Sequence, residues 1–213
     1  FIKQNIFPWI RLNRIVRDIP NLNIIGGNEN VNLRQKILAR KDVNCPCIRC
    51  REVKNTDGIE NAELFVRQYN GLNSMEYFIS YESKDQKILY GFLRLRINFT
   101  NEDLIYKELE DCSFVRELHV YGSVEKVNQK EHSTTVQHMG FGKKLIKEAE
   151  SIAWDYGYHN IAIISAVGTR EYYRKQGYQL KNTLLHYNIK CDNPKKKNIS
   201  TGLRGDCVRP LYF

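Results

Sequence analysis

The stretch that decides the fold is Gln137-His138-Met139-Gly140-Phe141-Gly142, which runs into Lys143-Lys144-Leu145-Ile146. From 140 to 156 apolar side chains recur at helical spacing, and Gly157 ends the run. Glycines at a helix entry let the backbone approach a ligand closely, and the unpaired N–H groups of the first turn bind a pyrophosphate. The stretch therefore predicts an amphipathic helix with a phosphate-binding N-terminus. A Gly-x-Gly pair is also a common turn device, so more evidence is needed.

Strand patterns lie on both sides of this helix. Residues 63–69, 75–81 and 88–96 are predicted strands, the last two joined by a hairpin at 83–86. Residues 114–121 alternate, with Leu118 and Val120 on one face and Glu117, His119 and Tyr121 on the other. After the helix we expect a strand at 161–164, a short helix at 168–176 and a further strand opening at Gly177-Tyr178. This order indicates an α/β domain.

The positive charge of the chain is concentrated near its N-terminus. The formal net charge is +9, and residues 1–54 hold eleven Lys or Arg against four Asp or Glu. Such a field favours a polyanion such as nucleic acid, although a solvated basic face is the simpler interpretation. No run of about 18 apolar residues is present, so we expect no membrane span. The first residue, Phe1, suggests a fragment or processed product of an intracellular protein.

Three of the six cysteines fall in Cys45-Pro46-Cys47-Ile48-Arg49-Cys50. Cysteines spaced so closely in a chain without secretory signals favour metal binding over disulfides. The alternative is three reduced, unliganded thiols. Three thiolates leave a tetrahedral zinc site one ligand short.

The pattern Gln-x-x-Gly-x-Gly at 137–142 looks like the pyrophosphate loop of GNAT acetyltransferases. About thirty residues later, Tyr172-Tyr173-Arg174-Lys175-Gln176-Gly177-Tyr178 resembles a second segment of the same superfamily. The resemblance implies a GNAT N-acyltransferase fold with a mixed, splayed central sheet flanked by helices, and acetyl-CoA as the ligand. The cofactor-binding residues that it implies are Glu117, Leu118, His119, Val120, Gln137, His138, Met139, Gly140, Phe141, Gly142, Lys143, Ser165, Tyr172 and Tyr173.

Three of these residues are candidates for catalysis. The resemblance places the Tyr173 phenol near the departing sulfur, where it can protonate or hydrogen-bond the thiolate. Glu117 matches in position the base glutamate of lysine-acetylating relatives, and His119 on the same face competes for that role. The alternatives are half-buried packing tyrosines and satisfied polar groups in a strand. No Ser-His-Asp or Cys-His arrangement is apparent, so we expect no acyl-enzyme.

A closer resemblance is carried by Arg14-Ile15-Val16-Arg17-Asp18-Ile19-Pro20, by the cysteine segment up to Val53, and by Arg116-Glu117-Leu118-His119-Val120-Tyr121-Gly122. Together these look like the catalytic subunit of Elongator, a family of tRNA wobble-uridine acetyltransferases, over residues 10–185. The resemblance implies transfer of acetyl from acetyl-CoA toward C5 of uridine 34. It also implies a cytoplasmic protein that binds the tRNA anticodon stem-loop, with Elongator-like partner subunits or self-association.

The same resemblance implies a radical S-adenosylmethionine domain with a [4Fe-4S] cluster, whose cysteine triad and barrel we expect before Phe1. It also implies a structural zinc on Cys45, Cys47 and Cys50, with His119, Cys112 or another residue as the fourth ligand. We expect three parts: residues 1–60 as a basic, cysteine-containing remnant of the radical domain, 61–189 as the GNAT domain, and 190–213 as a basic tail.

Two departures from the family keep other functions open. Thr135-Val136 stands where relatives often have Lys-Phe, and the chain continues beyond the usual end near Leu185. One alternative is a protein lysine N-acetyltransferase, in which Glu117 deprotonates a lysine ammonium. A second alternative is a tRNA-binding module with an inactive acetyl-CoA site.

Overall fold

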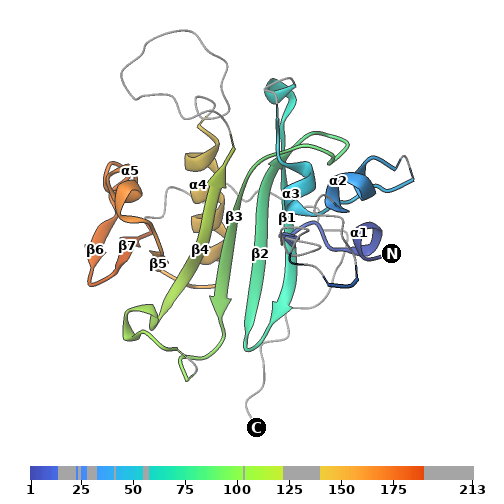
Figure 1. Cartoon of the computed structure of the whole chain (residues 1–213). Coiled ribbons are helices and arrows are strands. Elements are labelled where there is room, and N and C mark those ends of the chain that lie inside the picture. Colours follow the sequence, from blue (N-terminus) through green and yellow to red (C-terminus); the bar gives the residue numbers. More distant parts are fainter. Residues whose placement is uncertain are drawn as a thin grey trace, which may run out of the picture.

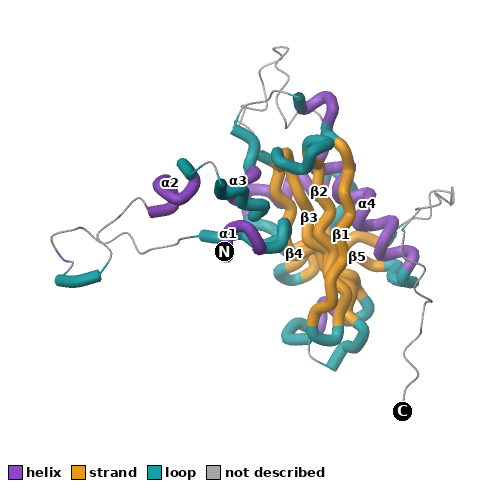
Figure 2. The backbone as a smooth tube through the Cα atoms, turned by 90° about the vertical axis from the view of Figure 1, so that its right-hand side faces the viewer, coloured by secondary structure: helices purple, strands orange, loops and turns teal. Residues whose placement is uncertain are grey.

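The computed structural model describes residues 1–13, 23, 25–27, 33–40, 42–54, 58–102, 104–121 and 140–189. These residues form one seven-stranded sheet with the order β1-β2-β3-β4-β5-β7-β6. The long helix α4 covers one face of the sheet, and the short N-terminal helices lie on the other (Figures 1 and 2).

The first four strands form an antiparallel meander: β1 (Glu63–Gly71), β2 (Ser74–Glu82), β3 (Leu89–Asn98) and β4 (Cys112–Val120). The predicted hairpin between the second and third strands is confirmed. Between β3 and β4 the register shifts, because Arg94 faces Glu117 while Leu95 faces Val115. Arg116 is the extra residue of this bulge, and its presence sends Glu117 and His119 to one face and Leu118 and Val120 to the other.

The chain then crosses the sheet through α4 (Phe141–Asp155) and returns as β5 (Asn160–Ile163), which is parallel to β4. The short helices η4 (Val167–Thr169) and α5 (Arg170–Arg174) follow. The sheet ends with an antiparallel pair, β6 (Gln179–Lys181) and β7 (Leu184–Asn188). The expected mixed, flanked sheet is therefore present.

The main core lies between α4 and the sheet. Leu145, Ile146 and Ala149 of α4 are buried against inward-facing residues of β2, β3 and β5, among them Ile79, Leu93, Leu95, Ile97, Ile161 and Ile163. These are the helix positions whose spacing predicted an amphipathic face. Leu118 and Val120 pack against this core, as their strand face predicted.

The N-terminal segment packs on the opposite face. It contains α1 (Ile2–Asn5), α2 (Leu33–Leu38) and α3 (Ile48–Arg51), and the short turns η2 (Ile59–Asn61) and η3 (Lys107–Leu109) flank the meander. Ile48 is fully buried with Phe78, Leu89 and Phe92, and Trp9 packs against this group. This second cluster attaches the cysteine-containing segment to β2 and β3.

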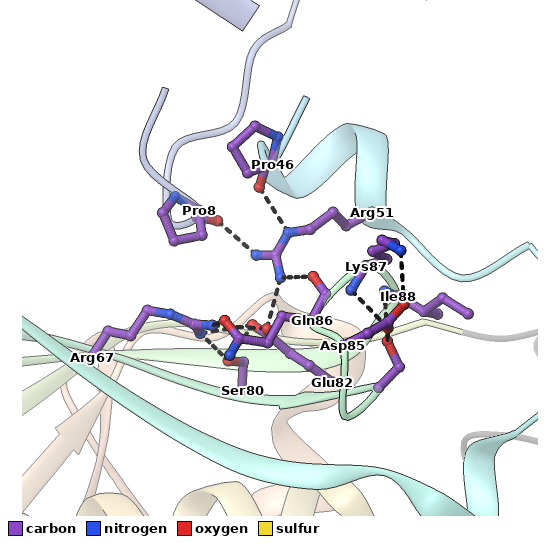
Figure 3. Close-up of polar contacts among 11 residues, drawn as sticks. Pro8, Pro46, Arg51, Arg67, Ser80, Glu82, Asp85, Gln86, Lys87 and Ile88 are labelled. Atoms are coloured by element: carbon purple, nitrogen blue, oxygen red, sulfur yellow. Dashed lines mark hydrogen bonds and ion pairs between the residues drawn. The ribbon is translucent and has the colours of Figure 1, made fainter. Parts of the chain in front are cut away.

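A buried charge cluster reinforces this attachment (Figure 3). Arg51 pairs with Glu82 at 2.8 Å, and the two side chains are 4% and 0% exposed. The same guanidinium donates to the carbonyls of Pro46 at 2.7 Å and Pro8 at 2.9 Å, so it connects two stretches of the N-terminal segment to β2. Arg67 of β1 supplies a second cation to Glu82 at 2.8 Å.

The pKa of Glu82 reflects this cluster. Burial works to raise the pKa of the carboxyl, but hydrogen bonds from Arg67 and Ser80 and the charges of both arginines outweigh it, so the pKa is lowered. Glu82 therefore holds the segment as an anion.

Candidate active site

The candidate site, here called the gap, lies where the pairing of β4 with β5 ends and β4 continues with a free edge. β4 and β5 pair only from Cys112–Val115 to Asn160–Ile163, with a last bond from the Ile164 N–H to the Val115 carbonyl at 3.2 Å. Beyond that point β4 continues to Val120 and pairs only with β3 among the described residues. The backbone from 116 to 120 thus offers peptide groups toward the gap. Such a strand edge can hydrogen-bond an extended ligand that carries amides.

The N-terminus of α4 lies on the phosphate side of the predicted site. Gly140 precedes the helix in the left-handed region at φ 66°, which favours glycine. At Gly142 a Cβ would lie 2.5 Å from the hydroxyl of Tyr172, so the missing side chain is what lets the two elements approach. Lys143 is exposed beside them. Gln137, His138 and Met139 lie outside the described residues.

Phe141 is turned away from this entry. It is 2% exposed and stacks on Tyr81 with ring centroids 4.3 Å apart, while the Lys144 ammonium lies 5.4 Å from the Phe141 ring centroid. Phe141 therefore anchors the first turn of α4 to the sheet, and the structure gives it a packing role.

Two tyrosines lie on α5, and the hydroxyl of Tyr172 lies at the α4 entry. Tyr172 is 38% exposed, whereas Tyr173 is 5% exposed and packs edge-on against Tyr178 at 6.0 Å. Burial, with a further contribution from the phenol of Tyr172, raises the pKa of Tyr173 to about 12. Tyr173 is therefore a protonated phenol at neutral pH and can donate a proton or a hydrogen bond.

Ser165 lies just past the end of β5, next to the gap. Its hydroxyl oxygen is buried and has no hydrogen-bond partner among the described residues. Buried hydroxyls are nearly always paired, so this one fits a ligand that supplies an acceptor or donor. The unpaired hydroxyl, the open edge of β4 and the glycine entry of α4 together fit an acyl-CoA thioester, whose arm carries amides and whose far end carries a pyrophosphate.

Glu117 projects from the free half of β4 on the face opposite α4. Arg94 donates to its carboxylate at 3.0 Å and also to the Trp9 carbonyl at 2.8 Å. The Glu117 side chain is 43% exposed, so solvent and an acceptor can reach it. Its placement beside the gap suits a base that takes a proton from an attacking group.

His119 lies two residues further along β4 on the same face. Its ring stacks on Phe92 at 6.0 Å with an interplanar angle of 14°, and it lies 4.4 Å from the ring of Tyr121. Burial, followed by the charge of Glu52, raises the pKa of Tyr121, so this phenol is neutral. His119 thus belongs to an aromatic surface beside Glu117.

The three predicted metal ligands come together in the N-terminal segment. The sulfur atoms of Cys45, Cys47 and Cys50 all lie within 4.8 Å of one another, and this group can hold a metal ion. Zinc–thiolate bonds of about 2.3 Å would bring the three sulfur atoms closer to one another. Arg34 donates to the Cys50 sulfur at 3.1 Å, and Lys3 does so at 3.7 Å.

The thiols of this group have displaced pKa values. Burial raises the pKa of Cys45 to about 11. Burial also acts to raise the pKa of Cys47, but hydrogen bonds from the backbones of Leu12 and Cys50 and from the neighbouring thiols lower it to about 7. The fit to zinc therefore rests on three sulfurs, of which one is readily ionised.

Neither named candidate for a fourth ligand joins the cysteines. Both Cys112 and His119 are described, yet the group contains only the three cysteines. Cys112 begins β4, where its sulfur lies 3.9 Å from Nδ1 of His186, and His119 is held in the aromatic surface. The fourth ligand, which the sequence left open among His119, Cys112 and other residues, is therefore not identified among the described residues.

Comparison with known proteins identifies similar chains. No protein-family model matches the chain. Elongator complex protein 3 of Drosophila melanogaster is 45% identical over 197 residues, which are 87% of this chain and 35% of that protein. Over this stretch the chain is similar to Elongator complex protein 3.

Two archaeal proteins are also similar to this chain. A protein named tRNA uridine(34) acetyltransferase from Methanocaldococcus jannaschii is 38% identical over 189 residues, 83% of this chain and 34% of that protein. The solved structure of Methanocaldococcus infernus Elp3 with an N-terminal deletion superposes with a TM-score of 0.73 at 34% identity, over 87% of this chain and 46% of that chain. The chain spans about a third of the length of the curated Elongator relatives it matches.

The structure also contains a site residue that the sequence did not single out. Arg94 contacts both Glu117 and the N-terminal segment. Its signal was the alternation Leu93-Arg94-Leu95-Arg96 in β3, which places two arginines on the same face as Glu117. Alternation identifies the face but does not say which arginine meets the carboxylate.

Proposed function

We propose that this chain binds acetyl-CoA in the gap between β4 and β5 and acts as the acetyl-donating part of an enzyme that modifies wobble uridine 34 of tRNA. The main support is the open edge of β4, together with the unpaired Ser165 hydroxyl just past β5 and the glycine entry of α4. The names of the archaeal Elongator relatives support the tRNA substrate. The final product that we propose is a C5-carboxymethyl uridine.

In this proposal the pyrophosphate lies at the first turn of α4, and the thioester lies between Glu117 and Tyr173. Without the rest of the modification machinery, the reaction is tRNA-stimulated hydrolysis. Glu117 takes a proton from water, the water oxygen bonds to the thioester carbon, and the carbon–sulfur bond breaks. Tyr173 protonates the departing sulfur, which leaves free CoA and acetate.

We assign a structural role to zinc on Cys45, Cys47 and Cys50, because their segment packs against β2 and β3 rather than beside the gap. We assign the radical chemistry at C5 to an S-adenosylmethionine domain with a [4Fe-4S] cluster outside these 213 residues. The anticodon stem-loop of tRNA, Elongator-like subunits and self-association remain proposals for its partners. Among the described helices, none has the length and apolar character needed to cross a membrane.

The test is release of CoA thiol from acetyl-CoA with and without tRNA. We expect tRNA to raise the turnover and Tyr173→Phe to lower it by on the order of 10²-fold. Tyr158→Phe is the matched control, because it removes a hydroxyl bonded to the Asn98 carbonyl at the far side of the core. Equal turnover with and without tRNA, together with acetylation of a lysine peptide, would favour a protein acetyltransferase. Absence of acetyl-CoA binding by calorimetry would leave an inactive tRNA-binding module.

A further inference from the structure

We propose that Arg94 is a positioning residue for the acceptor side of the site. In this role it holds the Glu117 carboxylate at the open end of the β4–β5 gap and ties its place to the docked N-terminal segment. The inference rests on the proposed function, because it gives Glu117 a part in turnover. It adds a residue that touches neither acetyl-CoA nor tRNA in the proposed site.

The first argument is the geometry at the carboxylate. Arg94 donates from Nε to Oε2 of Glu117 at 3.0 Å, across the pair that the β-bulge creates between β3 and β4. Its side chain is 17% exposed, whereas that of Glu117 is 43% exposed. The arginine is thus the fixed partner and the carboxylate the accessible one. A charge-assisted bond from a fixed donor restricts where an exposed carboxylate can lie.

The second argument is what holds the arginine. Its guanidinium carbon lies 5.7 Å from the ring centroid of Phe78 and 5.6 Å from that of Phe92, both of which are buried. Cations over aromatic faces at this range are attracted to the ring. These rings also belong to the cluster that contains Ile48, so the packing that docks the N-terminal segment is the packing beneath Arg94.

The third argument is the second hydrogen bond of Arg94. Nη2 donates at 2.8 Å to the carbonyl of Trp9, a residue of the N-terminal segment. That carbonyl is itself held, because the Trp9 ring is stacked between Phe7 at 4.7 Å and Tyr69 at 4.9 Å, with interplanar angles of 5° and 3°. Arg94 therefore joins a rigid point of the segment to the carboxylate beside the gap. The planar guanidinium fork serves both acceptors at once in a fixed geometry.

β3 provides a matched control two residues away. Arg96 lies on the same face and is part-buried, but it binds Glu76 at 3.0 Å, Asn98 at 2.6 Å and the Leu72 carbonyl at 3.1 Å. Loss of Arg96 removes a comparable set of hydrogen bonds to other residues of the meander. It reports what a purely structural loss on this face does to turnover.

The experiment measures kcat and the KM for acetyl-CoA, with tRNA present, in the full 213-residue chain and in its variants. We expect Arg94→Met to lower kcat by on the order of 10²-fold, as Glu117→Gln does, with the KM for acetyl-CoA changed by less than about twofold. The double variant should be no slower than the slower single variant, because both changes remove one function. Arg94→Lys should restore part of kcat, and Arg96→Met should stay within about twofold of the parent.

The outcomes separate the inference from the proposed function. If Glu117→Gln turns over at the parent rate, the proposed role of Glu117 is lost. If Glu117→Gln is slow but Arg94→Met is not, or if the two losses multiply, the inference is overturned and the proposed function stands. An equal loss in Arg96→Met also overturns it. Should Arg94→Met fail to fold by circular dichroism, Arg94→Lys decides, since parent kcat in that variant contradicts the need for a fork.

Discussion

Replacement of Glu82 by Gln tests how the N-terminal segment is held to the sheet. The change keeps the side-chain shape but leaves Arg51 and Arg67 without their shared anion, and their side chains are 4% and 17% exposed. Breaking a buried ion pair by removal of one partner costs about 3–5 kcal/mol, because the remaining charge is left uncompensated. Water cannot easily solvate either guanidinium at these exposures. We therefore place the loss in the free energy of unfolding at the upper end of this range.

The assay is urea unfolding at pH 7, followed by the fluorescence of Trp9 in the segment and Trp154 in α4. Glu76→Gln is the matched control. Glu76 is also buried between two arginines, but Arg96 and Arg116 are 29% and 47% exposed and can be solvated. We expect a smaller loss for Glu76→Gln, about 1–3 kcal/mol.

The pH dependence of the free energy of unfolding gives a second check, because its direction can be predicted. The pKa of Glu82 is lowered in the folded protein from its ordinary 4.5, so the unfolded chain binds the proton more tightly. The stabilisation by Glu82 is therefore present above pH 4.5 and lost as the pH falls through the folded pKa. The difference between parent and Glu82→Gln should narrow over that range. A loss below about 1 kcal/mol at pH 7, or a difference that does not change in acid, would refute the reasoning.

Three further predictions concern the site. In Gly142→Ala the new Cβ would lie 2.5 Å from the Tyr172 hydroxyl and force it to move. The affinity for acetyl-CoA measured by calorimetry should therefore fall about tenfold, while the melting temperature changes little. Unchanged affinity would contradict a ligand at this entry. Turnover should show no loss from ionisation of Tyr173 up to pH 10, because the pKa of this phenol is raised to about 12. A decline in turnover near pH 9 that is present in the parent and absent in Tyr173→Phe would contradict this prediction. Purified protein should contain one zinc per chain by mass spectrometry, and Cys47→Ser should lose the metal and lower the melting temperature; a metal-free parent removes the zinc proposal.

Patterns within one element predicted much of this architecture. The apolar spacing of Leu145, Ile146 and Ala149 identified α4, and alternation in β4 assigned Leu118 to the core and Glu117 to the other face. Local sequence also predicted the hairpin between β2 and β3. These features depend on neighbours a few residues away, whose geometry the chain itself sets.

Such local patterns could not predict the contacts between distant segments. Arg51 and Glu82 meet because α3 docks on β2, and the Arg94 bond to the Trp9 carbonyl joins residues 85 positions apart. Nothing in either local sequence marks the pairing, because each arginine alone resembles a surface cation. The cysteine group was predictable because its spacing is short, whereas its missing fourth ligand depends on a contact from elsewhere in the chain.

The ladder between β4 and β5 is short, and the proposed ligand would extend it. Four residue pairs join the meander to the strands that follow, and past Val115 this edge of β4 has no strand partner among the described residues. An extended thioester lying there would act as a substitute strand, with its amides completing a hydrogen-bond ladder that the polypeptide leaves unfinished. This ladder would then resist separation less when empty than with the ligand bound. The force needed to separate residues 115 and 163 should therefore rise when the acetyl donor is bound.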